Sequence, residues 1–240
     1  MKEILEMGPG ELRAEVRRSA RRKTIGLTVD RGGELIVHAP EAAALQDLQS
    51  WMQTKRLWVH QTLARKQHFA GHAHRAAPEF VTGESFSYLG RAYPLKLVRD
   101  QEEPLRFDGT RFLLRRDANP NAARLFQNWY VRTGSVWLSE RIGRFARRTG
   151  TSPERIDVRE LKFRWGSCGK NGALHFNWRL LQLPARFVDY VIVHELVHLA
   201  HPFHNAEFWK HVELAMPDWH DRKERMEQTA ASYLVFGIPL

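Results

Sequence analysis

Residues 191–204 have the sequence Val191-Ile-Val-His-Glu-Leu-Val-His-Leu-Ala-His-Pro-Phe-His204, which holds the most specific pattern in this chain. It contains H-E-x-x-H, formed by His194, Glu195 and His198, and a further histidine six residues later, His204. On a helix, residues four apart share a face, so the imidazoles of His194 and His198 can reach one metal ion. Catalytic zinc takes three protein ligands and keeps a fourth position for water, from which Glu195 can accept a proton. The pattern therefore predicts a hydrolytic zinc site.

Two histidines on an amphipathic helix can also arise by chance and serve only in packing. Apolar residues surround this motif: Val188, Val191, Ile192, Leu196 and Leu199. His and Glu in such surroundings would be half-buried polar groups that need partners. Pro202 ends the helix soon after the motif, which allows the chain to bring His204 back towards the other histidines. The spacing of the three histidines is also that of the metzincin proteases. These features favour a metal site.

The third ligand has rivals. Metzincins have a glycine between their second and third ligands where this chain has His201, followed by Pro202, so the turn must be built differently here. His201 comes only three residues after His198 and is predicted to lie still within the helix. We favour His204 as the ligand because of its reach. Weaker rivals are His211, Glu213 and His220.

Composition limits the class of protein. With 240 residues, 43% of them hydrophobic, the chain can form one large domain or two small ones. The single cysteine, Cys168, rules out an internal disulfide and suits a reducing compartment. Residues 1–10 lack the features of a signal peptide, and no stretch is long and apolar enough to span a membrane. We expect a soluble cytoplasmic protein with no membrane partner.

The chain carries an excess of positive charge, with 37 Lys and Arg against 27 Asp and Glu and a formal net charge of +10. Such a charge can attract nucleic acid, although arginine-rich faces are often only solvated. The densest positive patch in the first forty residues is Arg17-Arg-Ser-Ala-Arg-Arg-Lys23. A nucleic-acid partner, if there is one, would bind here. The oligomeric state is left open.

Residues 1–118 are predicted to form a β-rich N-terminal region with one helix at about 41–68. Strand-like alternation runs through residues 11–40, with a turn at 30–33, and resumes over 79–116, with a hairpin turn at Asp108-Gly109. The helix is predicted to open at Pro40. Its apolar stripe favours packing in a core: Leu45, Leu48, Met52, Leu57, Trp58 and Leu63. The polar segment that contains His72 and His74 is typical of a linker. The sequence has no internal repeats.

Residues 119–240 are predicted to form a second domain. A long helix runs from Asn119-Pro120 to a glycine stop at Gly150. Two strands, roughly 156–165 and 173–181, are predicted to form a hairpin joined by residues 166–172. The motif helix begins after Pro184, and a last helical region begins near Asn205. The predicted fold class is α+β.

Three blocks carry a resemblance to a known family. They are Arg18-Ser-Ala-Arg-Arg-Lys-Thr-Ile25, then Arg164-Trp-Gly-Ser-Cys168 with Asn177-Trp178-Arg179, and lastly Tyr190-Val-Ile-Val-His-Glu-Leu-Val-His198 continuing to His204-Asn-Ala-Glu-Phe-Trp209. In these blocks the chain resembles the YgjP-like metallopeptidase family, which is related to the SprT-like and WLM zinc proteases. The resemblance implies a zincin-like catalytic half, in which a small sheet packs on helices. It also implies His194, His198 and His204 as zinc ligands and Glu195 as general base.

We therefore expect a zinc-dependent metallopeptidase that cuts peptide bonds with metal-activated water. The hairpin at 156–181 would offer an edge strand to an extended peptide. Arg164 and Trp165 could line the cleft, although core packing is the simpler explanation of Trp165, and Asn177 could hold a ligand or the substrate carbonyl. Cys168 is explained most simply as a small residue in a tight turn, or else as a removable zinc ligand or a redox-sensitive thiol.

Two alternatives remain open. The same metal site, surrounded by arginines, could hydrolyse a phosphoanhydride as a nucleotide pyrophosphatase, although the sequence lacks a phosphate-cradling G-x-x-x-x-G-K-[ST] loop. The basic N-terminal region could instead bring the protease to DNA-bound protein, as the SprT relationship suggests, although no recognised DNA-reading motif is present.

Overall fold

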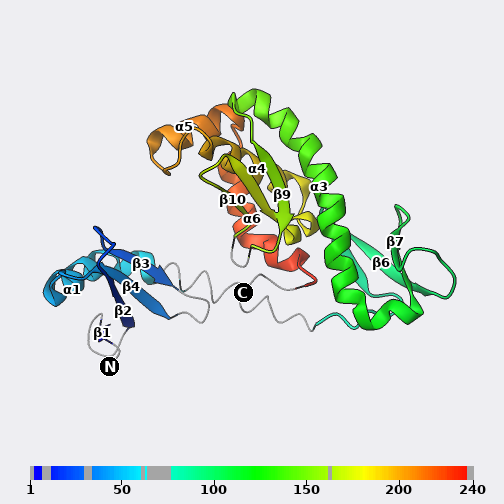
Figure 1. Ribbon diagram of the computed structural model, residues 1–240, viewed down its shortest axis with the longest axis horizontal. Helices are drawn as coiled ribbons and strands as arrows, with labels where there is room; N and C mark the ends of the chain where they lie inside the picture. Colours follow the sequence, from blue (N-terminus) through cyan, green and yellow to red (C-terminus); the bar gives the residue numbers. More distant parts are fainter. Residues whose placement is uncertain are drawn as a thin grey trace. The chain divides into compact units, whose positions relative to one another are not determined.

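A computed structural model of the chain describes residues 3–6, 12–29, 34–60, 63, 77–161 and 164–236 (Figure 1). The fold is a mixed α+β arrangement of three small sheets and helices. Contacts divide the chain into two compact units, Met1–His74 and Arg75–Leu240. This division lies earlier than the predicted boundary after residue 118. The reason is that Phe86, Leu95 and Phe112 share one hydrophobic core with the long helix that follows them.

The first unit contains a four-stranded sheet of order β1-β2-β4-β3, in which β2 and β4 are parallel and the outer pairs are antiparallel. Its elements are β1 (Glu3–Glu6), β2 (Arg13–Ser19), β3 (Gly26–Val29), β4 (Leu35–Pro40) and helix α1 (Leu45–Thr54). Leu48 and Met52 of α1 pack in one core with Ala14 and Val37 of the sheet. The strands predicted over residues 11–40 are confirmed in this region.

Two expectations for this unit were wrong. Pro40 does not open the helix but is the last residue of strand β4, and α1 begins at Leu45. The apolar stripe is only partly buried, because Leu45, Leu57 and Trp58 are 49%, 71% and 45% exposed. Beyond a turn at Lys55 the chain is again helical over residues 56–60 and at Leu63. The predicted turn at 30–33, the remainder of the helix towards His68, and His72 and His74 lie outside the described residues.

Arg18, in the basic patch, has a structural role. Its guanidinium donates to both carboxylate oxygens of Glu3, each at 2.8 Å, and to the carbonyl oxygens of Ala43 and Glu41 at 2.6 and 3.1 Å. The hydrogen bonds from this cation hold the Glu3 pKa below its ordinary value. Arg18 therefore ties β1 to the segment before α1.

The second unit begins with another four-stranded sheet, of order β5-β6-β8-β7. Its strands are β5 (Ser85–Tyr88), β6 (Arg91–Val98), β7 (Leu105–Phe107) and β8 (Phe112–Arg115). The turn predicted at Asp108-Gly109 is confirmed, with the Asp108 carboxylate accepting the N–H groups of Thr110 and Arg111. The central pair is again parallel and the outer pairs antiparallel, so both four-stranded sheets share one topology without a sequence repeat.

This sheet is bonded directly to the segment before the motif helix. The N–H of Leu89 donates to the carbonyl of Leu181 at 2.7 Å, and that of Gly90 to Gln182 at 3.2 Å. Gly90 has φ of +80°, and a Cβ there would meet Cα of Pro184 at 2.7 Å. The close approach requires glycine. Residues 77–118 therefore help to position the site.

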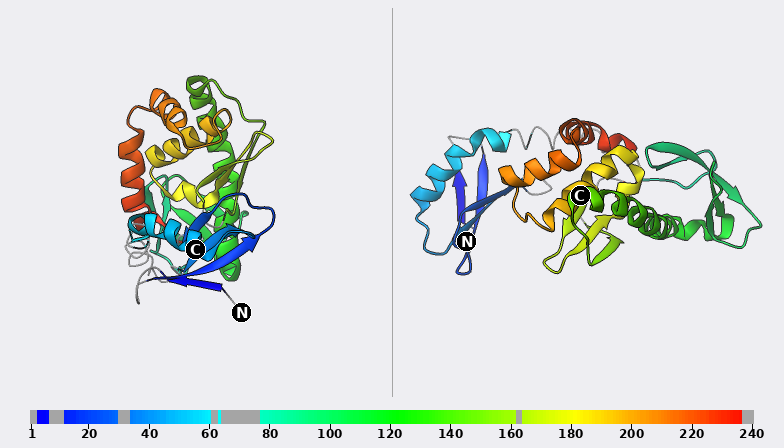
Figure 2. Two further views of the ribbon diagram at one scale, coloured as in Figure 1. Left: turned by 90° about the vertical axis from the view of Figure 1, so that its left-hand side faces the viewer. Right: turned by 90° about the horizontal axis from the view of Figure 1, so that it is seen from above.

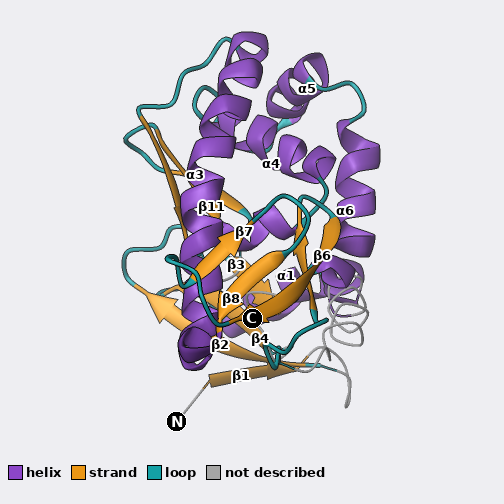
Figure 3. Ribbon diagram, turned by 90° about the vertical axis from the view of Figure 1, so that its right-hand side faces the viewer, coloured by secondary structure: helices purple, strands orange, loops and turns teal. Residues whose placement is uncertain are grey.

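The long helix predicted from Asn119 to Gly150 is confirmed as a 3₁₀ turn, η1 (Arg116–Asn121), followed by α3 (Ala122–Thr149), with Gly150 in the left-handed conformation. Figure 3 shows α3 extending from the β5–β8 sheet to the motif region. One face of α3 is buried along its length, with Phe126, Tyr130, Leu138 and Ile142 almost wholly inaccessible. The helix α3 therefore contributes to the core of this unit along its whole length.

The third sheet differs from the predicted hairpin. Its strands are β9 (Arg155–Arg159), β10 (Gly166–Cys168) and β11 (Ala173–Asn177), in the order β10-β11-β9. The β11 strand is central; it pairs in parallel with β9 and antiparallel with β10. The segment predicted as one strand over 156–165 therefore ends at Arg159, and β10 forms within the expected connection. This correction leaves β10, not the 156–165 strand, at the edge near the motif.

Three helices complete the unit, after a second 3₁₀ turn, η2 (Trp178–Gln182): the motif helix α4 (Ala185–His198), α5 (Ala206–Ala215) and α6 (Trp219–Tyr233). The predicted start of α4 after Pro184 is confirmed, as is the start of α5, where the Asn205 side chain accepts the N–H of Phe208. Figure 2 shows α4 between α6 and the β9–β11 sheet. No helix in the described part of the chain is long and apolar enough to cross a membrane.

Arg141 of α3 anchors α4 through a buried carboxylate. Asp189 of α4 is 4% exposed, and Arg141 donates to its two oxygens at 2.6 and 2.7 Å. Arg222 of α6 adds a guanidinium nitrogen 3.5 Å from the same carboxylate. The bidentate geometry makes this a strong, directional contact. It links three helices little more than one turn before the first motif histidine.

Candidate metal centre

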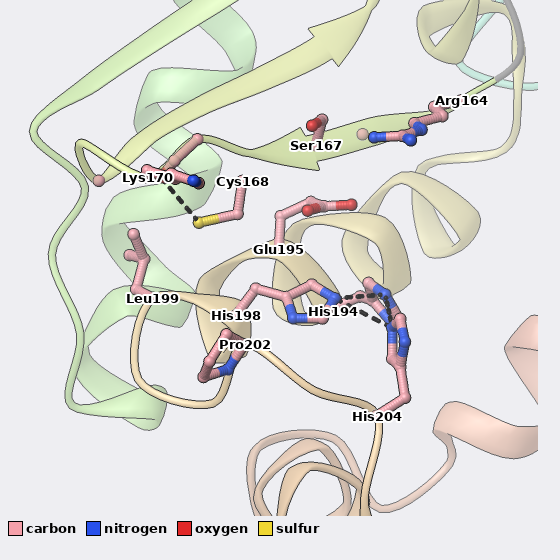
Figure 4. Close-up of a pocket in the computed structure, with 13 residues that line it drawn as sticks. Arg164, Ser167, Cys168, Lys170, His194, Glu195, His198, Leu199, Pro202 and His204 are labelled. Carbon is pink, nitrogen blue, oxygen red and sulfur yellow. Dashed lines mark hydrogen bonds between the residues drawn. The ribbon is translucent and has the colours of Figure 1, made fainter. Parts of the chain in front are cut away.

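Three histidines converge at the C-terminal end of α4. The Nε2 atoms of His194 and His198 are 3.2 Å apart, those of His198 and His204 are 3.0 Å apart, and those of His204 and His194 are 2.9 Å apart (Figure 4). Helical spacing brings the first two together, and the chain turns back after Pro202 to bring the third. Within the described residues, this is the group of His, Cys, Asp or Glu side chains whose geometry could hold a metal ion.

The donor set fits a cation. His198 Nδ1 lies 3.1 Å from the carbonyl oxygen of His201, to which it can only donate, so its Nε2 presents a lone pair to the other two rings. Three imidazoles whose Nε2 atoms face one point cannot all satisfy one another by hydrogen bonding, whereas a metal ion satisfies all three lone pairs. The structure specifies no particular ion.

The environment keeps these imidazoles neutral. Burial, with the charges of His198, His204 and Lys223 adding to it, lowers the pKa of His194 to about 3. Burial likewise lowers the pKa values of His198 and His204. A neutral imidazole is the form that ligates metal, so the site is arranged for ligation at neutral pH.

His204 lies in the loop between α4 and α5 and is held by aromatic rings. Its ring stacks on that of Trp209, with ring centroids 5.6 Å apart, and forms a T-shaped contact with Phe208, with centroids 4.7 Å apart. Phe208 also contacts the rings of His194 and His198, at 5.0 and 4.5 Å. Trp209 in turn stacks on Trp219 at 4.5 Å. Helical spacing alone did not reveal these supports, although Phe208 and Trp209 belong to the third block of the resemblance.

Glu195 is buried beside the histidines. Its side chain is 6% exposed, and burial raises its pKa to about 7, although the charge of Arg164 and a hydrogen bond from the Cys168 N–H act to lower it. Gly166 of β10 lies directly against this carboxylate, and a Cβ there would be 2.6 Å from Cγ of Glu195. A carboxyl that titrates near neutral pH can both accept and return a proton.

An open cavity of about 590 Å³ joins these groups. It is lined by the three histidines, Glu195, Leu199 and Pro202 on one side, and on the other by Arg164, Gly166, Ser167, Cys168, Gly169, Lys170 and Gly172 (Figure 4). The prediction that Arg164 lines the cleft agrees with this geometry. Lys170, Ser167 and Gly166 were missed, because their place at the cavity depends on the tertiary position of β10.

Two residues predicted near the substrate lie elsewhere. Asn177 is fully buried; its amide donates to the carbonyl of Arg164 and its oxygen accepts the N–H of Arg179. Trp165 is partly buried and packs against the main core. Neither lines the cavity. Asn177 therefore supports the backbone of Arg164, and Trp165 has the packing role that was the simpler explanation.

The rival ligands are not part of the histidine cluster. The ring of His201 packs on that of His211, with centroids 4.1 Å apart, and the cluster contains neither His201, His211, Glu213 nor His220. Cys168 lines the cavity, but its Sγ donates to the carbonyl of Gly169 at 3.7 Å and is outside the cluster. Burial and the charge of Glu195 raise the thiol pKa, which disfavours the thiolate that would bind metal.

Comparison with known families gives a match to the YgjP-like family, metallopeptidase domain, over residues 23–229. The chain belongs to the YgjP-like family. This match covers most of the chain and includes the second and third blocks in full, but only residues 23–25 of the first. The metallopeptidase zymogen abylysin of Pyrococcus abyssi has a similar crystal structure, with 22% sequence identity, a TM-score of 0.35, and coverage of 37% of this YgjP-like chain and 90% of abylysin. No match was found among curated proteins.

Proposed function

We propose that this YgjP-like protein is a zinc-dependent peptidase with His194, His198 and His204 as ligands and Glu195 as general base. The observation that carries the proposal is the convergence of three Nε2 atoms within 3.2 Å of one another, beside a buried carboxylate in an open cavity. The family match supports the reaction class. Three histidines with one open position are the ligand set of catalytic zinc.

A bound zinc ion would polarise the peptide carbonyl and acidify a water molecule. The Glu195 carboxylate accepts the proton of that water, because burial raises its pKa to about 7 and so makes it a stronger base than an ordinary carboxylate. The same carboxyl, now protonated, donates to the nitrogen of the departing amine. Arg164 and the Cys168 N–H favour the charged form of Glu195, and so keep enough of the base deprotonated.

The strand β10 is the element best placed to bind an extended peptide. It pairs only with β11 among the described strands, and its residues Gly166–Cys168 line the cavity beside Glu195. Backbone pairing along its free edge would hold a peptide with little dependence on side chains. We therefore propose β10 as the edge strand for an extended peptide, the role expected of the 156–181 hairpin.

Metal content and hydrolysis of purified variants test the proposal together. Wild type and Glu195→Gln should each bind about one zinc per chain, because the carboxylate is not a ligand, whereas His204→Ala should lose the metal. His201→Ala is the matched control, since His201 lies on the same turn but outside the cluster; it should keep both metal and activity. Circular dichroism of each variant checks that it is folded.

The substrate assay separates the enzyme classes. Casein hydrolysis that disappears in Glu195→Gln and His204→Ala would support the peptidase. Hydrolysis of nucleoside triphosphates with the same dependence, and none of casein, would instead establish the pyrophosphatase. Folded wild-type protein that binds no metal would contradict the proposed zinc site.

Nucleic-acid association through the basic N-terminal region remains a separate proposal. Arg18 is engaged with Glu3 and main-chain carbonyls, whereas Arg21, Arg22 and Lys23 have exposed side chains. The test is DNA binding by the full chain at increasing salt concentration. A steep fall in affinity with salt would support a nucleic-acid partner, and absence of binding at low salt would contradict this proposal.

A further inference from the structure

The cavity beside Glu195 has an unbalanced charge. Apart from the histidines, its charged lining residues are Arg164, Lys170 and Glu195. Neither cationic side chain forms an ion pair or hydrogen bond with any residue that the structure describes, so both charges are available. Glu154 packs against Gly172 nearby but does not line the cavity. The lining of the cavity therefore carries two cationic side chains against the single carboxylate of Glu195.

The two cations flank the edge strand. Arg164 comes two residues before β10 and Lys170 two residues after it. Only residues 166–168 between them are in strand conformation, with Lys170 in the turn that follows, and Gly166 lies against Glu195. Figure 4 shows Arg164 at one end of this strand segment and Lys170 at the other, with Glu195 between them.

We propose that the cleft selects peptides with acidic side chains on both sides of the bond that is cut, one bound by Arg164 and the other by Lys170. This inference rests on the proposed peptidase function and names the substrate class. A peptide paired with β10 would rise about 3.3 Å per residue. The two cations would thus meet side chains within roughly three residues of the cut bond on either side. Charge complementarity of this kind gives specificity and faster association.

The test uses quenched fluorescent peptides that are identical except at the positions two or three residues before and after the central bond. Each flank carries Glu, Gln or Lys, and kcat/KM is measured for wild type, Arg164→Gln, Lys170→Gln and Arg144→Gln. Arg144 is an exposed cation on α3 that does not line the cavity, so its variant is the matched control. All proteins are used as full chains loaded with zinc.

Wild type should cleave the peptide with Glu on both flanks at least about tenfold faster than the Gln peptide, with roughly a threefold to fivefold contribution from each cation. Arg164→Gln should remove the preference on one flank and Lys170→Gln the preference on the other, while Arg144→Gln keeps both. Lys170→Glu should reverse the preference on its flank, and salt should weaken the selectivity of the wild type.

The outcomes separate the two proposals. Cleavage of all peptides at similar rates, or preference for Lys, would overturn the acidic-substrate inference and leave the peptidase intact. Cleavage of no peptide by folded, zinc-loaded wild type would overturn the peptidase itself. Equal loss of preference in Arg144→Gln would show that the effect comes from net charge, and would also overturn the assignment to Arg164 and Lys170.

Discussion

Gly166 and Glu195 approach so closely that no side chain fits between them. A Cβ built on Gly166 would lie 2.6 Å from Cγ and 2.7 Å from Oε1 of Glu195. Gly166 belongs to the edge strand and Glu195 to the motif helix, so this contact sets the distance between strand and helix. The glycine thus allows the proposed general base to lie directly against the proposed peptide-binding strand.

Replacing Gly166 by alanine should therefore displace the carboxylate. We expect Gly166→Ala to retain metal but to lower kcat/KM by about tenfold to a hundredfold, because a shift approaching 1 Å at a reacting group has an effect of that order. Gly143→Ala is the control, since a Cβ at Gly143 of α3 meets nothing within 4 Å. Wild-type activity in a folded Gly166→Ala protein would show that the close contact is not required.

Trp209 is expected to act as a positioning residue for His204. Trp209→Ala removes the ring that stacks on His204 at 5.6 Å, and should weaken zinc affinity about tenfold by leaving the loop ligand less constrained. Trp209→Phe should recover part of the affinity. Phe203→Ala serves as control, because Phe203 is adjacent to His204 but 75% exposed. The measurement is competition with a zinc chelator, and unchanged affinity in Trp209→Ala would contradict the assignment.

Arg141 should contribute strongly to stability. Arg141→Ala leaves the Asp189 carboxylate, 4% exposed, with only the longer contact to Arg222. Urea unfolding of the full chain should show a loss of about 2–4 kcal/mol in the free energy of unfolding, because an uncompensated buried charge remains. Adding Asp189→Asn should restore part of this loss. Arg144→Ala, an exposed position on the same helix, should change the stability by less than about 0.5 kcal/mol.

Cys168 is expected to be dispensable for metal binding. Its thiol donates to the Gly169 carbonyl, and its raised pKa disfavours the thiolate. Cys168→Ala should therefore keep wild-type zinc content and resting activity. The hydrogen bond to Glu195 comes from the main-chain N–H of residue 168, which alanine retains. A rise in resting activity on removal of the thiol would instead support the alternative that Cys168 is a removable zinc ligand.

The sequence alone identified the histidine cluster because the information that specifies it is local. Residues four apart on a helix share a face whatever surrounds them, so the spacing of His194 and His198 is enough to pair them. Pro202 and the Asn205 cap are likewise local signals, and they correctly marked the end of α4 and the start of α5. The same applies to the long helix that stops at Gly150.

Tertiary structure decided what surrounds that cluster. Alternation indicates a strand but does not say which strand pairs with it, so the parallel pairing of β9 with β11 and the edge position of β10 were not predictable from residues 156–181. Lys170, Gly166 and Trp209 reach the site through this packing. The Asn177 side chain, by contrast, is buried in the interior, where its amide forms hydrogen bonds with the main-chain groups of Arg164 and Arg179. Sequence spacing determined the histidine cluster, and long-range contacts between strand and helix determined the cleft.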